Sequence, residues 1–220
     1  IIADLGLNDS VSVLGQKQFV DITHYNTTLV FNKEKSAEEA DTMKSYLNEN
    51  KYTKQNIFVS MQSAVTHNAD DSVTMDTYLV VPESTEDFSS YIELKNRVSK
   101  EELQMSNDGV IITEKISMKL GLNVGDYVTF RVDDKEYQAP ITGITENYAY
   151  HYIYMPPAVY EQVFGEPVTY TNAFAIVPDL NDTVKSEIAG DLLERDDIMA
   201  LSYNDTIIDQ FNNTISSMQA

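Results

Sequence analysis

Apolar and polar positions follow their clearest order between Gly109 and Pro157. Val110 to Ile112 form a short apolar run that is typical of a buried strand. Apolar residues at helical spacing then lead to Gly121, which stands where a helix ends with a residue at positive φ. From Val128 to Val132 apolar and polar residues alternate, which predicts a half-buried strand. The stretch therefore predicts a compact unit of strand, short helix, tight turn and hairpin.

The connections within this unit are also marked by the sequence. Thr113 is a good helix N-cap, because its hydroxyl can accept from a backbone N–H of the first turn. Asn123 to Asp126 predicts a tight turn, and Asp133 to Glu136 a polar hairpin tip. Tyr137 to Thr145 returns as a second strand, and Pro140 indicates that this strand lies at a sheet edge.

Amphipathic helices are expected at both ends of the chain. The first has one face formed by Leu7, Val11, Leu14 and Gln18. The last has a seam of Ile208, Phe211, Ile215 and Met218. We expect Ile208, Phe211 and Ile215 to face Leu7, Val11 and Leu14. Neither helix has a stop signal where the sequence ends, which indicates a segment of a longer chain. An ordinary pair of terminal helices is the alternative.

The remaining pattern mixes strands and helices. Strands are predicted at 26–32, 56–65, 72–81, 91–97, 169–177 and 198–202. Helices are predicted at 36–50, 158–164 and 184–194. Ser36 and Glu39 match a capping box for the first of these helices, and Asp182 or Thr183 would cap the last. The segments 56–65 and 72–81 form a hairpin with its tip at 67–71. This alternation predicts an α+β (mixed α/β) fold in two lobes.

Composition narrows the possible functions. The chain has 220 residues and a formal net charge of −20, which argues against nucleic-acid binding because phosphate contacts need a basic surface. A solvated acidic surface is the plain interpretation of that charge. The absence of cysteine excludes a disulfide framework, a thiolate metal site and a cysteine nucleophile. The sequence contains no apolar run long enough to span a membrane.

A search for catalytic chemistry finds no constellation. His24, His67 and His151 are scattered, without a second ligand at helical spacing. The acidic pairs 70–71, 133–134 and 196–197 fall at predicted turns and do not match a calcium loop. No phosphate-binding, dinucleotide-binding or hydrolase motif is present. We therefore predict no catalytic, cofactor or metal site and no cofactor, with an enzyme of unrecognised type as a remaining alternative.

A run of tyrosines is the one unusual surface candidate. The period of two in a strand would place Tyr148, Tyr150, Tyr152 and Tyr154 on one face. Aromatic rings in a row can form a platform for a sugar, a peptide or another partner. The plainer alternative is a strand that packs on its neighbour, with the hydroxyl groups at the rim.

The central stretch resembles a known family. GVIITEKISMKLGLNVGDYVTF, followed by ITGITENYAYHYIYMPPAVYEQVFG, is similar to the extracytoplasmic domain of bacterial FtsX/MacB-type ABC transporter permeases. The family's strand–helix–Lys-Leu-Gly-Leu–Gly-Asp–strand block corresponds to Ile111 to Asp126, and its later strand to Ile141 to Ile144. Gly6 to Phe19 resembles the segment leaving the first membrane helix, and Asp205 to Ala220 resembles the approach to the second.

The resemblance implies a domain plan. It implies a membrane-proximal lobe with terminal stalk helices, formed by residues 1–82 and 168–220. A smaller α/β lobe at 83–167, containing the Gly-Leu-x-x-Gly-Asp block, would be inserted into it. It places this domain on the extracytoplasmic face of the cell membrane. ATP hydrolysis would belong to a separate nucleotide-binding subunit, and a second permease copy or related permease would be a partner.

A non-enzymatic role follows from this resemblance. The domain would bind or gate a substrate, or transmit ATP-driven motion to a partner. The substrate or partner is an unknown peptide, lipoprotein, antibiotic or cell-wall protein, and not a nucleic acid. A free-standing surface module that binds a glycan or peptide through the tyrosine-rich strand is the alternative function.

Overall fold

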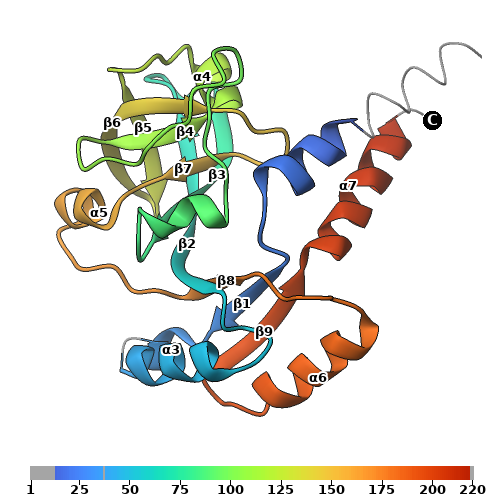
Figure 1. Ribbon diagram of the computed structural model, residues 1–220. Coiled ribbons are helices and arrows are strands. Elements are labelled where there is room, and N and C mark those ends of the chain that lie inside the picture. The colour runs from blue at the N-terminus through green and yellow to red at the C-terminus, as the bar shows by residue number, and fades with distance from the viewer. Residues whose placement is uncertain (1–12, 37, 219–220) are drawn as a thin grey trace, which may run out of the picture.

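One long strand, β2 (Asn56–His67), joins the two halves of the molecule. The computed structural model describes residues 13–36 and 38–218. Residues 56–59 of β2 pair within an open sheet, and residues 59–67 pair within a closed barrel (Figure 1). The described chain is therefore a mixed α+β fold in which two β structures share a strand.

The barrel is built from consecutive and non-consecutive strands. Its other members are β3 (Thr74–Pro82), β4 (Val110–Thr113), β5 (Tyr127–Val132), β6 (Lys135–Thr145) and β7 (Tyr152–Tyr154). They follow the order β3-β7-β4-β6-β5-β2, and β2 also pairs with β3, so the wall closes on itself. Two short helices, α4 (Glu114–Leu120) and α5 (Pro157–Phe164), pack against the wall.

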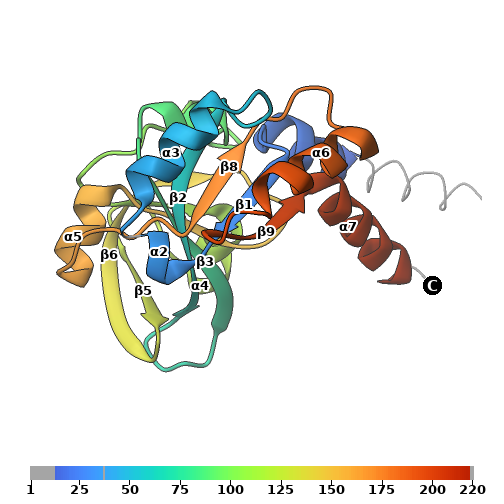
Figure 2. The same cartoon turned by 90° about the horizontal axis from the view of Figure 1, so that it is seen from below.

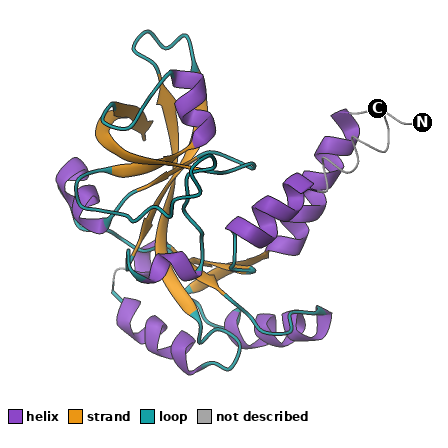
Figure 3. Ribbon diagram, turned by 45° about the horizontal axis from the view of Figure 1, so that its top comes forward, coloured by secondary structure: helices purple, strands orange, loops and turns teal. Residues whose placement is uncertain are grey.

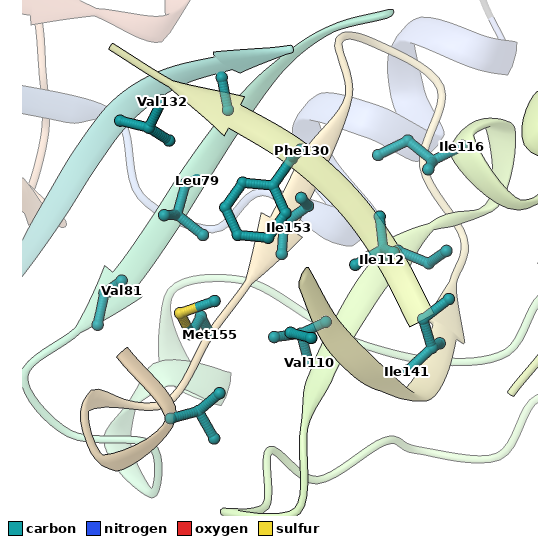
Figure 4. Close-up of a cluster of buried hydrophobic side chains, with 14 of the residues drawn as sticks. Leu79, Val81, Val110, Ile112, Ile116, Phe130, Val132, Ile141, Ile153 and Met155 are labelled. Atoms are coloured by element: carbon teal, nitrogen blue, oxygen red, sulfur yellow. The ribbon is translucent and has the colours of Figure 1, made fainter. Parts of the chain in front are cut away.

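Branched and aromatic side chains fill the barrel. In β5 the burial alternates along the strand, so that Val128, Phe130 and Val132 point inward. Four side chains in this cluster are fully buried and point toward one another in Figure 4: Leu79, Ile112, Phe130 and Ile153. Because burial of one such side chain contributes about 1.5–3 kcal/mol, this cluster is a main source of stability for the barrel.

The open sheet is antiparallel and has the order β2-β8-β1-β9. It adds β1 (Thr27–Phe31), β8 (Asn172–Ala175) and β9 (Ile198–Tyr203). Helices α3 (Ala40–Glu49) and α6 (Asp182–Leu192) cover one face of it (Figures 1 and 2). Phe58 points toward these helices, whereas Ile57 and Phe174 point to the opposite face and pack near the short helix η2 (Asp87–Ser90).

Two helices form an arm beside this body. The first runs through residues 13–22 and contains η1 (Lys17–Ile22); the second is α7 (Asn204–Met218). They lie side by side in Figures 1 and 3, and the rings of Phe19 and Phe211 are 5.5 Å apart in an edge-to-face arrangement. Leu7, Val11 and the side chain of Ile215 lie outside the described residues, so the contacts predicted for them stay predictions. None of the described helices is long and apolar enough to cross a membrane.

The structure confirms the central unit predicted from the sequence. Gly121 ends α4 at φ 66°, and Leu122 N–H donates to Ser117 O at 3.0 Å. Asp126 N–H donates to Asn123 O at 3.1 Å in the predicted tight turn. The predicted hairpin of β2 and β3 is present, and so are the strand–helix–hairpin order of β4, α4, β5 and β6 and the helix α5.

Pro140 does not lie at a sheet edge, so that prediction is wrong. Strand β6 lies between β4 and β5. Ile141 N–H donates toward β5, to Asp126 O at 2.8 Å. The ring nitrogen of Pro140 therefore points toward β4, where pairing begins only at Ile141. A proline is tolerated inside the sheet because no ladder hydrogen bond is lost at this position.

Three capping predictions are also wrong. Thr113 occupies the predicted N-cap position of α4, but its hydroxyl accepts from Tyr152 N–H of β7 at 3.1 Å and makes no capping bond to the helix. Ser36 ends a separate short helix, α2 (Lys33–Ser36), and donates to Lys33 O, so no capping box forms. Helix α6 is capped by Asn181, whose side-chain oxygen accepts from Val184 N–H at 3.0 Å.

The segment predicted as a strand at 91–97 takes part only in isolated bridges, Thr23 with Ile92 and Lys95 with Glu102. The predicted division of the chain into 1–82 with 168–220 and 83–167 stays a prediction. In the structure the hairpin of β2 and β3, which precedes residue 83, contributes two strands to the barrel wall.

Candidate functional site

The tyrosine segment begins as a loop and only then becomes a strand. Strand β7 covers Tyr152–Tyr154 alone, and Tyr150 before it has a φ of 63°. The side-chain amide of Asn147 closes the loop by donating to Ala149 O at 2.7 Å and Tyr150 O at 3.0 Å. The four tyrosine rings therefore do not share one exposed face.

Of the two rings of β7, that of Tyr154 is buried and that of Tyr152 is half-buried. Tyr154 is 2% exposed, and its ring lies 5.6 Å from that of Phe88. The ring of Tyr152 stacks on that of Tyr154 at 5.6 Å. Burial raises the pKa of both tyrosines well above the ordinary value. These rings contribute to packing and leave little surface for a partner.

Tyr148 connects this loop to the first helix. Its hydroxyl donates to the buried carboxylate of Glu146. Burial is the main cause that raises the pKa of Tyr148, and this hydrogen bond is the second. The side-chain oxygen of Gln18, a residue only 4% exposed, accepts from Tyr148 N–H at 2.7 Å and from Ala149 N–H at 3.1 Å. The loop is thus fastened to the helical arm.

Tyr150 is the member of the row that faces solvent. It is 51% exposed, and its ring lies 6.3 Å from that of Tyr78 on β3 in an edge-to-face arrangement. Both rings line a groove of about 860 Å³ on the outer wall of the barrel. The groove is also lined by the β5–β6 hairpin tip, Asp133 and Asp134.

The groove is negatively charged. Its arginine, Arg131, already pairs with Asp71 at 2.9 Å and Glu136 at 3.2 Å, and the hydrogen bond to Asp71 is the main cause of its raised pKa. Asp76, Asp133 and Asp134 have no ion-pair partner among the described residues. These three carboxylates are therefore available to an incoming positive charge.

His151 lines the same groove as a neutral group. Its Nδ1 atom is buried without a hydrogen-bond partner among the described residues. Burial, and then the positive charge of Lys115, lower the pKa of His151, while Asp76 opposes that shift. The ring is expected to carry no charge at neutral pH.

The other two histidines, His67 and His24, do not line the groove. Nε2 of His67 lies 2.8 Å from Glu136 Oε1 without hydrogen-bonding geometry, and Nδ1 lies 3.1 Å from Asp71 Oδ1. His24 lies near Glu93, at 3.9 Å. In the described part of the chain, no group of three or more His, Asp or Glu side chains is placed to hold a metal ion.

No signal in the sequence assigns the groove residues outside the tyrosine row to a shared site. Asp76 and Tyr78 alternate with buried residues along β3, a pattern typical of an outward-facing strand surface. That signal shows exposure only. The approach of the distant hairpin tip at 133–134 depends on barrel closure, which the sequence does not specify.

Comparisons with known proteins find similarity in structure only. No protein-family model and no curated protein matches the sequence. The structure of the periplasmic region of MacB from Actinobacillus actinomycetemcomitans is similar at 16% identity and TM-score 0.47, covering 87% of this chain and 94% of that chain. The extracellular domain of the noncanonic ABC-type transporter YknZ from Gram-positive bacteria shows 17% identity and TM-score 0.45, over 80% of this chain and 99% of that chain.

A third solved structure is a domain of a putative permease protein from Porphyromonas gingivalis. It shows 14% identity and TM-score 0.35, over 82% of this chain and 89% of that chain. The names of the second and third structures describe a domain of a transporter and a domain of a permease.

Proposed function

We propose that this chain is the extracytoplasmic domain of an FtsX/MacB-type ABC transporter permease, inserted between two transmembrane helices. The observation that carries the proposal is the helical arm. The helix at 13–22 and α7 come from opposite ends of the described chain, yet they lie side by side, with Phe19 against Phe211. A domain held between two neighbouring membrane helices needs such a paired connection.

The domain works as a mechanical element and not as an enzyme. Helix α7 follows β9 directly and is tied to α6 by the ion pair between Lys185 and Asp205. The first helix reaches the barrel through Gln18 and the loop at Tyr148. A movement of the arm would therefore reach both the open sheet and the barrel wall.

This role requires partners outside the chain. ATP would be hydrolysed by a separate nucleotide-binding subunit that acts through the membrane helices. A second permease copy would complete the transporter, and the domain would pass the motion to a substrate or partner protein at the extracytoplasmic face.

The location can be tested with cysteine labelling, because the chain has no cysteine of its own. Ser45→Cys places a thiol on the exposed face of α3 in the full-length protein. We expect a membrane-impermeant maleimide to label it in intact cells. Met43→Cys, on the buried face of the same helix, is the matched control and should label only after denaturation.

Two results would contradict the proposal. One is labelling of Ser45→Cys only after the cells are broken open. The other is a full-length protein that lacks an apolar span of about 20 residues next to one or both ends of this segment.

A further inference from the structure

The groove on the barrel wall is bordered by an open strand edge. Strand β7 pairs with β3 only from Tyr78 to Val80. Tyr78 N–H donates to His151 O at 2.9 Å on that side. Alternate residues of a strand point their backbone groups to the same side, so those of Asp76 also point there. In the described part of the chain no other segment pairs with Asp76 on this side.

An unpaired backbone edge is a template for an added strand. Extended peptides bind such edges through main-chain hydrogen bonds, and the pockets beside the edge select their side chains. The segment Thr74–Thr77 of β3 therefore offers backbone groups directly beside the groove.

The charge of the groove selects the kind of side chain that enters. Asp76, Asp133 and Asp134 line it, and its only lining cation among the described residues, Arg131, is already paired with two carboxylates. Counting Asp71 and Glu136, the groove and the ion pairs at Arg131 thus contain five carboxylates and one guanidinium group. A positively charged ligand is attracted to this surface and an anionic one is repelled.

The aromatic rings favour the same ligand. Tyr78 and Tyr150 are 39% and 51% exposed, and they stand edge to face at the rim of the groove. The face of a tyrosine ring attracts an ammonium or guanidinium group within about 6 Å of its centre. The rings also provide apolar area for the methylene stem of lysine or arginine.

We propose that this groove binds an extended segment of a partner polypeptide that carries lysine or arginine side chains. The backbone of the segment pairs with the β3 edge at Asp76, and a cationic side chain lies between the tyrosine rings and the hairpin tip. The inference rests on the groove alone, so it stands or falls separately from the proposed role in a transporter.

The probe for this test is an acetylated, amidated pentalysine peptide, with binding to the 220-residue chain measured by calorimetry. The triple variant Asp76→Asn, Asp133→Asn and Asp134→Asn should bind it about tenfold more weakly, from the loss of three exposed charge pairs. Asparagine preserves the hairpin tip, because it tolerates the φ values of 49° and 63° at positions 133 and 134.

A matched control removes the same charge elsewhere. Asp41→Asn, Glu49→Gln and Asp209→Asn are exposed positions on α3 and α7, away from the groove. This triple variant should change the affinity by less than about twofold, since only long-range and screened interactions are altered. Tyr78→Leu should weaken binding about threefold through the lost cation–π contact.

Three results would overturn the proposal. Equal weakening in both triple variants would show general attraction to an acidic protein. Tighter binding of spermine than of pentalysine would assign the groove to a free polyamine. Unchanged affinity for a pentalysine peptide N-methylated at every backbone nitrogen would show that no strand is added at the β3 edge.

Discussion

The absence of a side chain at one position allows two strands of the barrel to approach closely. Gly109 precedes β4, and a Cβ atom added there would lie 2.1 Å from Pro140 O. That atom belongs to the backbone of β6, which is held on both sides by β4 and β5. The glycine is therefore required by the close contact between β4 and β6, and not by a positive φ.

We predict that Gly109→Ala lowers the free energy of unfolding by about 2–3 kcal/mol, because the strands must separate to fit the methyl group. Urea denaturation measures the change. Gly190→Ala is the control: nothing lies within 4 Å of a Cβ there, the site is in α6, and alanine should stabilise by about 0.5–1 kcal/mol. Equal stability of the wild type and Gly109→Ala would contradict the steric account.

His151 gives a pH prediction at the same scale. The pKa of His151 in the folded chain is lowered from the ordinary value of 6.5, so on acidification the unfolded chain binds a proton at this ring before the folded chain does. The neutral His151 therefore contributes to stability above pH 6.5, and that contribution is lost as the pH falls below 6.5. NMR titration of the ring should show the low pKa. Lys115→Gln should raise that pKa and Asp76→Asn should lower it further, because these charges act in opposite directions. Shifts of the reverse sign would refute the assignment.

At the scale of elements, β4 and β7 are connected by a side chain at the end of a strand. The Thr113 hydroxyl accepts from Tyr152 N–H at 3.1 Å, although its position before α4 is that of a helix cap. Strand β7 has three residues, so this bond is a large part of what fixes its register against β4.

Thr113→Val should therefore destabilise the protein by about 1–2 kcal/mol, since it leaves a partly buried N–H without an acceptor. Hydrogen exchange should speed up at the Tyr152 amide and stay unchanged in the first turn of α4. Thr113→Ser keeps the hydroxyl and should retain slow exchange. Faster exchange in α4 alone would instead support the capping role expected from the sequence.

The sequence predicted the elements whose signals are local. Gly121, with φ 66°, and the hairpin tip at Asp133 and Asp134 depend on backbone geometry that a few neighbouring residues determine. The errors at Thr113 and Pro140 arose because a partner strand far along the chain decides where their polar groups point. The groove was not predictable for the same reason: Asp76 and the hairpin tip meet only after the barrel closes.

For the whole molecule, the important contact is the one between the helical arm and the barrel. Gln18 lies on the helix at 13–22 and is 4% exposed, and its side-chain oxygen accepts from two consecutive amides of the loop at 148–149. The same loop presents Tyr150 at the groove. The arm and the groove are therefore joined by one short segment.

Gln18→Leu should keep the packing volume and remove the one oxygen that accepts both hydrogen bonds. We expect faster hydrogen exchange at Tyr148 and Ala149 and a looser Tyr150 ring, seen as averaged NMR shifts. Gln16→Leu changes an exposed residue of the same helix and should leave the loop as it is. If the loop amides remain protected in Gln18→Leu, the arm does not hold the loop.

The shared strand β2 also has a consequence for the order of folding. All pairings of the barrel lie between Val59 and Tyr154, whereas Thr27 of β1 pairs with Ala175 and Tyr203. Closing a longer loop costs more entropy and is slower. A chain leaving the ribosome can thus complete the barrel while β8 is still unmade, and pulse-labelled amides at Leu79 should become protected before those at Leu29.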